Sequence, residues 1–300
     1  QQLAPALDAC GAAELHGVLQ ALQGRFVPPG PSGAPSRGRP EVLPTGRNFY
    51  SVDVRAVPTP TAWRVGFASA SALLERHWQE QGEYPRTLGL SVWGTATMRT
   101  GGDDIAQALA LLGVRPVWEG SRVSNFEILP VSVLGRPRVD VLLRVSGFFR
   151  DAFSNVMTLF DQAVQAVAAL EDESEYDNPL RARILAEQAS LQAQGVAEQQ
   201  ARRQAGWRIF GSKPGAYGAG LQGPIDERNW SQRADLAYAY LHWGGYAYGS
   251  QDAGTAALSS FSQRVSQLQV VLHNQDNREH DLLDSDDYYQ FEGGLIAAAE

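Results

Sequence analysis

The sequence VDVLLRVSG (residues 139–147) decides the fold. A run of apolar and β-branched residues, typical of a buried strand, passes directly into a Ser-Gly turn, and a helix is predicted over residues 151–170. The same succession occurs at residues 87–93, where a second apolar strand ends at a glycine and a helix is predicted over residues 103–112. Strand, small turn residue and helix in repetition indicate an α/β fold.

Further elements extend this pattern in both directions. Helices are predicted over residues 3–22, 61–80, 179–204, 235–240 and 256–267, and strands over residues 115–118, 207–210 and 268–272. Prolines between residues 27 and 35 exclude helix and central strand there, because proline fixes φ and lacks an N–H donor. We therefore expect an α/β fold with mostly parallel sheet segments flanked by helices, a helical N-terminal entry and long functional loops. The expected division is a helical entry and Pro/Gly-rich loop (1–48), an α/β region (49–205) and a C-terminal α/β region with a His/Asp-rich motif (206–300).

The composition is that of a globular protein. Of 300 residues, 44% are hydrophobic and 19% are charged, and the formal net charge of −8 argues against nucleic acid, whose phosphates would be repelled. No apolar run approaches the roughly 18 residues of a membrane span. The single cysteine, Cys10, excludes an internal disulfide, and we expect a cytoplasmic protein. The N-terminus lacks Met and a signal-peptide pattern, and the C-terminus ends within a predicted helix, so we expect a piece of a longer protein.

The position of a functional site follows from the expected topology. In open α/β sheets, ligands bind beyond the carboxyl ends of the strands. A parallel sheet would bring together WGT (93–95), SG (146–147), GSK (211–213) and HNQD (273–276), which each follow a predicted strand. The sequence therefore predicts the site at this edge.

At these same segments the sequence resembles a known family. PPGPSG (28–33) leading into LPTGRNFY (43–50), WGT followed by IAQAL (105–109), GRPRVD (135–140) and SGFFRD (146–151) resemble the cobaltochelatase large subunit and its relative, the porphyrin-binding subunit of magnesium chelatase. RIFGSKPGAYG (208–218) and HNQDNREHD (273–281) favour the cobalt branch. The resemblance covers essentially the whole chain, and the family subunit is several times longer, so the chain resembles a fragment from its C-terminal part.

The resemblance implies ATP-dependent insertion of Co(II) into hydrogenobyrinic acid a,c-diamide, a corrin precursor of cobalamin. It also implies two smaller AAA+-type partner subunits that hydrolyse ATP with Mg. The chain has no Gly-x-x-x-x-Gly-Lys-Ser/Thr phosphate loop, because the glycines around Lys213 have the wrong spacing. We therefore expect ATP hydrolysis on the partners and no activity of the fragment alone.

Metal insertion needs exchangeable metal ligands and an acceptor for the protons displaced from ring nitrogens. Imidazoles and carboxylates gather in residues 273–292. We predict catalytic roles for His273, Asp276, Glu279 and His280, and metal ligation by these four and Asp281. The other acids of this stretch, Asp284, Asp286 and Asp287, are expected to cap a helix that begins near Ser285.

Substrate contacts are expected on the glycine-flanked loops. Arginine matches the carboxylate arms of a macrocycle with paired hydrogen bonds, and aromatic rings can wall the ring. The predicted substrate-binding residues are Arg47, Asn48, Tyr50, Trp93, Ser146, Arg150, Lys213, Tyr217 and Trp243. Alternatively, Arg47 and Arg150 could brace loops by pairing with Asp53, Asp151 or another acid, and His242 could line the ring pocket or fill a core.

Other functions stay open on the sequence alone. The chain could be a tetrapyrrole-binding module without catalysis, or an H-type magnesium-chelatase component acting on protoporphyrin. Magnesium prefers all-oxygen sites, so the histidines at 273 and 280 argue against the second alternative. An unrelated nucleotide-binding α/β enzyme is disfavoured by the missing phosphate loop.

Overall fold

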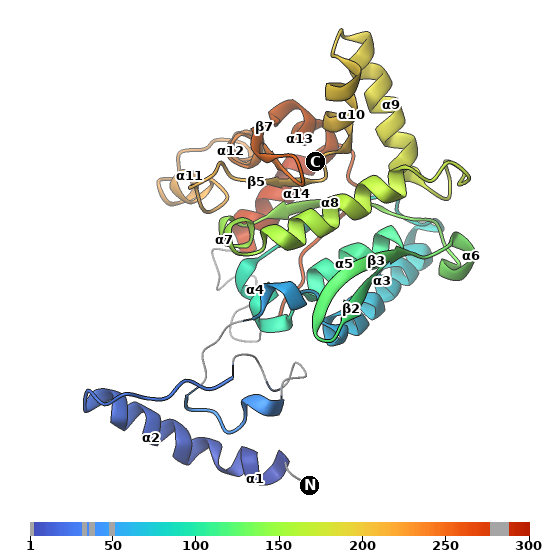
Figure 1. Ribbon diagram of the computed structural model, residues 1–300. Coiled ribbons are helices and arrows are strands. Elements are labelled where there is room, and N and C mark those ends of the chain that lie inside the picture. The colour runs from blue at the N-terminus through green and yellow to red at the C-terminus, as the bar shows by residue number, and fades with distance from the viewer. Residues whose placement is uncertain (1–2, 32–34, 36–39, 48–51, 277–287) are drawn as a thin grey trace.

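The computed structural model describes residues 3–31, 35, 40–47, 52–276 and 288–300. A six-stranded sheet in the order β7-β6-β5-β4-β1-β8 forms its centre (Figure 1). The strands β1 (Thr87–Val92), β4 (Asp140–Val145), β5 (Ile209–Gly211) and β8 (Val270–Leu272) are parallel. The short strands β6 (Tyr246–Tyr248) and β7 (Ala253–Ala256) continue the sheet in antiparallel pairing. The mostly parallel sheet confirms the predicted α/β fold, and it takes strands from both predicted α/β regions.

Alternation along the strands divides the interior into two cores. On one face, Leu88 and Leu143 pack into a core shared with α3 (Pro60–Gln81), α5 (Asp103–Leu112) and α8 (Ser154–Ala168). On the other face, Leu142 packs into a core shared with α12 (Arg233–Gly244), α13 (Leu258–Val265) and α14 (Gly293–Ala299). Both faces of β1 and β4 are thus buried, which explains their largely apolar sequences.

Helices begin directly after the strands, where small residues permit the turn. α4 (Gly94–Thr100) follows β1, and α7 (Gly147–Ala152) follows β4. The Ser146 hydroxyl accepts a hydrogen bond from Phe149 N (3.2 Å), so Ser146 caps α7. The helix predicted from residue 151 therefore starts earlier and is interrupted before α8.

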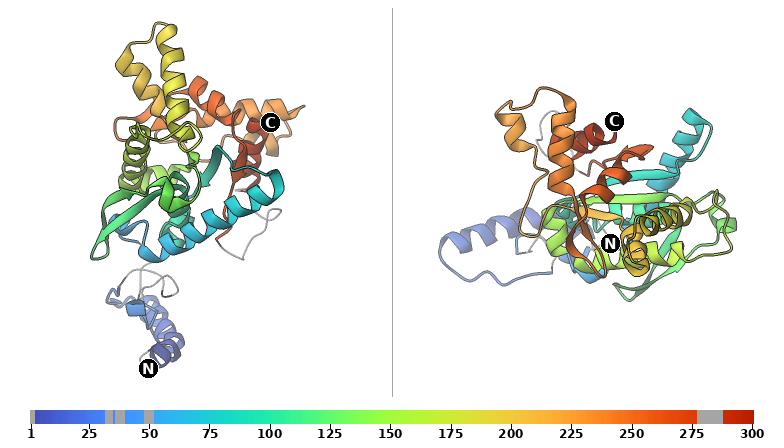
Figure 2. Two further views of the ribbon diagram at one scale, coloured as in Figure 1. Left: turned by 90° about the vertical axis from the view of Figure 1, so that its right-hand side faces the viewer. Right: turned by 90° about the horizontal axis from the view of Figure 1, so that it is seen from above.

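The helix predicted over residues 179–204 is two helices. α9 (Pro179–Ala193) and α10 (Glu198–Gly206) are separated at Gly195, whose φ of 87° only glycine adopts easily. Together they form a hairpin that projects from the body of the molecule (Figure 2, left).

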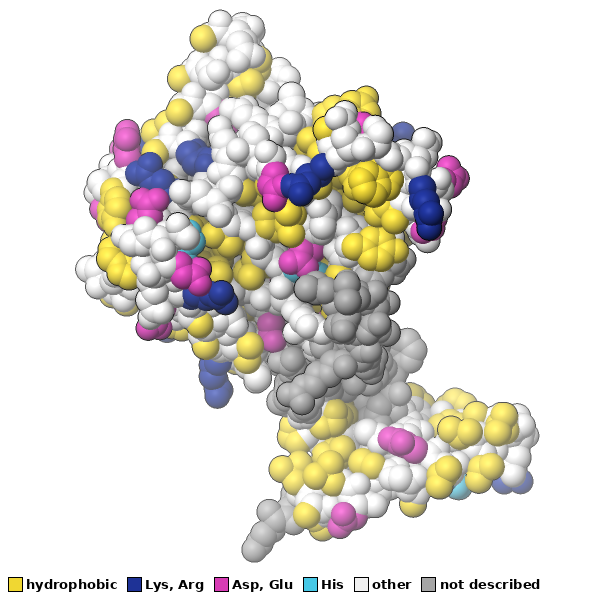
Figure 3. All heavy atoms as spheres, turned by 180° about the vertical axis from the view of Figure 1, so that it is seen from behind, with side chains coloured by type: hydrophobic (Ala, Val, Ile, Leu, Met, Phe, Trp, Pro, Cys, Tyr) yellow, Lys and Arg dark blue, Asp and Glu magenta, His cyan; other side chains and the backbone are white. Residues whose placement is uncertain are grey.

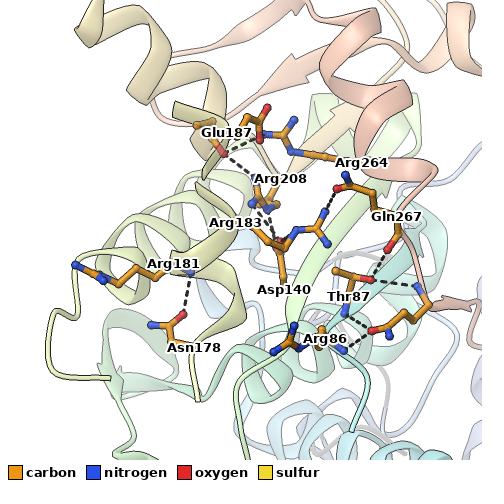
Figure 4. A network of polar contacts seen from close by, with 12 residues as sticks. Arg86, Thr87, Asp140, Asn178, Arg181, Arg183, Glu187, Arg208, Arg264 and Gln267 are labelled. Carbon is orange, nitrogen blue, oxygen red and sulfur yellow. Dashed lines mark hydrogen bonds and ion pairs between the residues drawn. The ribbon is translucent and has the colours of Figure 1, made fainter. Parts of the chain in front are cut away.

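A buried ionic network fixes the base of this hairpin (Figure 4). The Asp140 carboxylate accepts hydrogen bonds from Arg208 (2.6 and 3.1 Å) and pairs with Arg183 of α9 (3.2 Å). Arg264 of α13 pairs with Glu187 of α9 (2.7 Å). Because Asp140 is the first residue of β4, this network lies at the amino end of the sheet, opposite the predicted site.

The remaining elements are peripheral. β2 (Val114–Glu119) and β3 (Arg122–Ile128) form a separate antiparallel hairpin, followed by α6 (Val131–Leu134). α11 (Gln222–Asp226) precedes α12, and the π-helix η4 (Tyr288–Glu292) leads into α14. None of the helices in the described ranges combines the length and hydropathy of a membrane span.

The N-terminal segment lies to one side of the sheet (Figure 1). It contains α1 (Leu3–Asp8), α2 (Cys10–Leu22) and the 3₁₀ turn η2 (Pro40–Val42), and a second 3₁₀ turn, η3 (Val54–Ala56), precedes α3. The predicted entry helix is therefore confirmed, with a break at Ala9. Hydrophobic side chains are exposed along it (Figure 3), including Leu15 and Leu22.

Candidate functional site

The four loops that follow the parallel strands contact one another. Gly94 N donates a hydrogen bond to the Ser146 hydroxyl (3.2 Å), which joins the loops after β1 and β4. Arg150 Nη1 donates to the Ser212 carbonyl and hydroxyl (3.2 Å each), which joins the loops after β4 and β5. The Trp93 and His273 rings meet edge to face at 6.1 Å, which joins the loops after β1 and β8. The parallel topology thus assembles the segments as predicted.

His273 is a half-buried histidine at this edge, and its burial favours the neutral form of the imidazole. Its ring is flanked edge-on by Trp93 and by Tyr288 (centroids 4.8 Å apart). Burial lowers the pKa of His273, and the nearby Asp276 carboxylate only partly opposes this shift. The Nδ1 atom is buried without a hydrogen-bond partner among the described residues. An uncharged imidazole can accept a proton or ligate a metal ion.

Asp276 is engaged by an arginine. Its carboxylate accepts hydrogen bonds from Arg99 Nε (2.6 Å) and Nη2 (3.0 Å) of α4. Within the described ranges, no three His, Cys, Asp or Glu side chains are grouped to hold a metal. Glu279, His280 and Asp281, and the helix start expected near Ser285, lie outside the described residues. The predicted metal set is therefore represented only by His273 and Asp276.

Arg150 braces a loop, which is the alternative left open by the sequence. Its buried guanidinium donates through Nε and Nη2 to Asp151 (2.7 and 2.9 Å), and through Nη1 also to the Lys213 and Ala216 carbonyls. The Tyr217 hydroxyl donates to the same Asp151 (2.7 Å). Arg150 therefore fixes the loop over residues 212–217 instead of offering a free guanidinium.

The same loop presents side chains to solvent. Lys213 and Tyr217 are exposed, Tyr217 to 59%, and the Tyr217 ring covers Gly147. Trp243 Nε1 donates to the Gly218 carbonyl (3.2 Å), so the exposed Trp243 ring adjoins this loop. Lys213, Tyr217 and Trp243 thus form an exposed rim along this loop, whereas Trp93 lies half-buried beside His273.

The structure also shows where His242 and Arg47 lie. His242 is exposed and its ring lies against Tyr238 (3.7 Å between centroids), so it does not fill a core. Arg47 contacts Gly30, whose N–H donates to the Arg47 carbonyl (2.8 Å). The structure therefore places Arg47 with the N-terminal segment, not at the sheet edge. Asn48 and Tyr50 lie outside the described residues.

Sequence reasoning missed the polar residues beneath the site. Asn274 Nδ2 donates to Asp104 Oδ1 (2.8 Å) and Gln107 Oε1 (2.6 Å) of α5. Burial raises the pKa of Asp104 to about 7, and the charges of Asp103 and Asp276 add to this shift, while the Asn274 hydrogen bond opposes it. Acidic residues in a first helical turn ordinarily indicate capping, so no sequence signal distinguishes Asp104.

Two cavities formed by described residues lie away from this edge. One of about 380 Å³ opens between α9 and α13 beside Arg183, and one of about 490 Å³ lies beside Asp161 and Trp207. The ring-sized cleft at the carboxyl edge stays a prediction.

Comparisons with known proteins agree with the resemblance. A family model described as CobN/Magnesium Chelatase matches residues 1–300. The chain is 72% identical to the aerobic cobaltochelatase subunit CobN of Pseudomonas aeruginosa, over 100% of this chain and 24% of that protein. It is 34% identical to the H component of magnesium chelatase from Rhodobacter capsulatus, over 96% of this chain and 23% of that protein.

A solved structure shows the same fold. The catalytic subunit of cobaltochelatase from Mycobacterium tuberculosis superposes with a TM-score of 0.87 at 51% identity, over 99% of this chain and 25% of that chain. The chain therefore spans about a quarter of the length of the relatives it matches.

Proposed function

Since the chain belongs to the CobN/magnesium chelatase family, we propose that it is the portion of a cobaltochelatase large subunit that binds a tetrapyrrole and a metal ion. The proposed reaction is ATP-dependent insertion of Co(II) into hydrogenobyrinic acid a,c-diamide, with ATP hydrolysed by two AAA+-type partner subunits. Identity supports the cobalt branch: 72% and 60% to cobaltochelatase subunits, against 34% and 32% to the corresponding magnesium-chelatase proteins.

The observation that carries the proposal is the neutral His273 at the carboxyl edge of the sheet. Insertion puts a divalent ion in place of ring N–H hydrogen, one in a corrin and two in a porphyrin, so these protons must leave the ring nitrogens. A neutral imidazole can accept one of them, or can hold Co(II) before transfer, since cobalt accepts nitrogen ligands. Asp276, Glu279, His280 and Asp281 are proposed to complete the ligand set.

The other residues are proposed to hold the macrocycle. Tyr217 and Trp243 offer exposed aromatic surface along the rim, Trp93 adds a half-buried ring beside His273, and the exposed Lys213 can pair with a carboxylate arm. Ser146 and Arg150 contribute indirectly, because their polar atoms are bonded within the loops that they hold. Arg47, Asn48 and Tyr50 stay proposed substrate contacts from the N-terminal segment.

The test uses the complete large subunit with its partners and the substitution His273→Ala. We expect the rate of Co(II) insertion to fall by about 100-fold or more, the range of a lost general base, and ring affinity to change by less than about threefold. His77→Ala is the matched control, because His77 is a half-buried histidine of α3 bonded to the Glu83 carbonyl, away from the carboxyl edge of the sheet. Equal loss of insertion and ring binding in His273→Ala contradicts the proposed role. Faster turnover with Mg²⁺ and protoporphyrin assigns the chain to the magnesium branch.

A further inference from the structure

We propose that Asp104 and Gln107 of α5 and Arg99 of α4 position His273 by clamping the residues that follow it. This clamp comprises two contacts, one on Asn274 and one on Asp276, and its functional meaning rests on the proposed function. None of the three clamp residues touches the imidazole, so they are positioning residues.

The first contact saturates the amide of Asn274. The amide nitrogen carries two hydrogens, and it has two acceptors, Asp104 Oδ1 at 2.8 Å and Gln107 Oε1 at 2.6 Å. Both acceptor residues are buried, with exposed fractions of 5% and 2%. An amide whose two hydrogens are bonded to two buried acceptors is held in one orientation, so the residue next to His273 is fixed.

The second contact holds the loop two residues further on. Arg99 grips Asp276 through Nε and Nη2, the paired geometry that suits a carboxylate. Since β8 ends at Leu272, His273 lies between a strand of the sheet and this clamp. The backbone on both sides of the imidazole is therefore restrained.

His273 needs such restraint because its ring lacks the usual one. A metal-binding or catalytic histidine is ordinarily oriented by a hydrogen bond to its second ring nitrogen. In the described part of the chain, His273 Nδ1 has no such partner. Among the described residues, its orientation is set by its backbone and by the flanking Trp93 and Tyr288 rings.

The burial of the Asp104 carboxyl group also indicates that this residue orients the loop of the site and does not stabilise the fold. A carboxyl group buried to this degree disfavours its charged form, and the pKa of Asp104 rises to about 7. An apolar residue at this place would avoid that cost but would leave an Asn274 hydrogen without an acceptor. The carboxyl group is retained where it orients the loop of the site.

The experiment is a double-mutant cycle in the complete large subunit with its ATPase partners, using Asp104→Ala, Asn274→Ala and the double variant. The readouts are kcat/KM for Co(II) and hydrogen exchange of residues 270–276. Asp104→Ala should lower kcat/KM about tenfold, the worth of one hydrogen bond, and speed exchange of this segment. In the Asn274→Ala background the same substitution should add less than about twofold, because the clamp acts through Asn274.

Conservative variants distinguish loss of the hydrogen bond to Asn274 from loss of the Asp104 charge. Asp104→Asn keeps an oxygen acceptor for Asn274 and should stay within about threefold of wild type. If Asp104→Ala does not fold, Gln107→Ala removes the other acceptor and should also lower kcat/KM several-fold. The proposal is overturned if Asp104→Ala is as harmful with Asn274→Ala as without it, or if Asp104→Asn is as harmful as Asp104→Ala.

His273→Ala in the same assay distinguishes failure of the clamp from failure of the proposed function. An inactive His273→Ala together with a fully active Asp104→Ala refutes the clamp alone. A fully active His273→Ala variant refutes the proposed function itself. Faster hydrogen exchange of residues 270–276 in Asp104→Ala would still show that Asp104 holds this segment.

Discussion

Replacing Arg144 by methionine is expected to leave the chain as stable as wild type or more stable. Arg144 lies in β4 and is fully buried, and among the described residues its guanidinium donates one well-formed hydrogen bond, from Nη1 to the Val145 carbonyl (2.6 Å). Nε and Nη2 have no hydrogen-bond partner among the described residues. The charge is flanked by the Tyr240 and Phe291 rings, each with its centroid 5.3 Å from the guanidinium carbon.

The magnitude follows from opposing effects. Burying an ion costs several kcal/mol, and this burial lowers the pKa of Arg144. Two cation–π contacts in a desolvated setting return about 2 kcal/mol each. A buried methionine side chain contributes about 1.5–3 kcal/mol without a desolvated charge. We therefore expect Arg144→Met to change the free energy of unfolding by between 0 and about 2 kcal/mol in the stabilising direction.

The matched control is Arg208→Met, at a buried arginine that does have a carboxylate. Arg208 is bonded to Asp140, and removing it leaves that acid buried, with only Arg183 at 3.2 Å. We expect a loss of about 3–5 kcal/mol. Urea unfolding followed by tryptophan fluorescence measures both variants. A loss of about 3 kcal/mol or more in Arg144→Met would refute the reasoning. It would mean that the Arg144 guanidinium has further hydrogen-bond or ion-pair partners in the folded protein.

Two further predictions concern α5. Gly66→Ala in α3 should destabilise the chain by about 1–3 kcal/mol in thermal unfolding, because a Cβ there lies 2.5 Å from Gln107 N and 2.6 Å from Ala106 Cβ. Gly11→Ala in α2, with no atom within 4 Å of its Cβ, should be neutral or stabilising by up to about 1 kcal/mol, and equal effects would contradict the packing argument. Burial raises the pKa of Asp104 from 3.8 to about 7. Above about pH 4 the native state therefore keeps a proton on Asp104 that the unfolded chain releases. As the pH rises to 7, the contribution of Asp104 to the free energy of unfolding falls. Asp104→Asn should therefore gain stability relative to wild type between about pH 4 and pH 8 in urea titrations, and a pH-independent difference would contradict the shifted pKa.

The sequence predicts the elements whose signal is local. β1 and β4 are long apolar runs because both faces of each strand are buried, and their Gly and Ser-Gly ends mark the following helices. β6 and β7 have no such runs, since they are three and four residues long and rich in Tyr, Ala and Gly. They become strands because the edge of β5 offers hydrogen bonds, which is information from elsewhere in the chain.

The site shows the same division between local and distant information. Parallel topology alone predicts which loops meet, and those loops do meet. The partners of individual charges cannot be predicted in this way, because Arg99 and Asp276 are 177 residues apart in sequence. The Arg150–Asp151 pair is adjacent in sequence, yet only the structure shows that Arg150 also holds four acceptors of a loop more than 60 residues away.

The ion pairs of Asp276 and Arg150 change the electrostatic character proposed for the site. Asp276 and Arg150, two charged members of the predicted set, are each paired with an opposite charge, whereas Lys213 is exposed in the loop over residues 212–217. His273 is itself uncharged, so His273, Asp276 and Arg150 present little net charge to a ligand. A cage of unpaired carboxylates would bind a divalent ion strongly and release it slowly, whereas a chelatase must pass the ion to ring nitrogens. A neutral imidazole held by its backbone is a weaker and exchangeable ligand, which is the property that metal transfer requires.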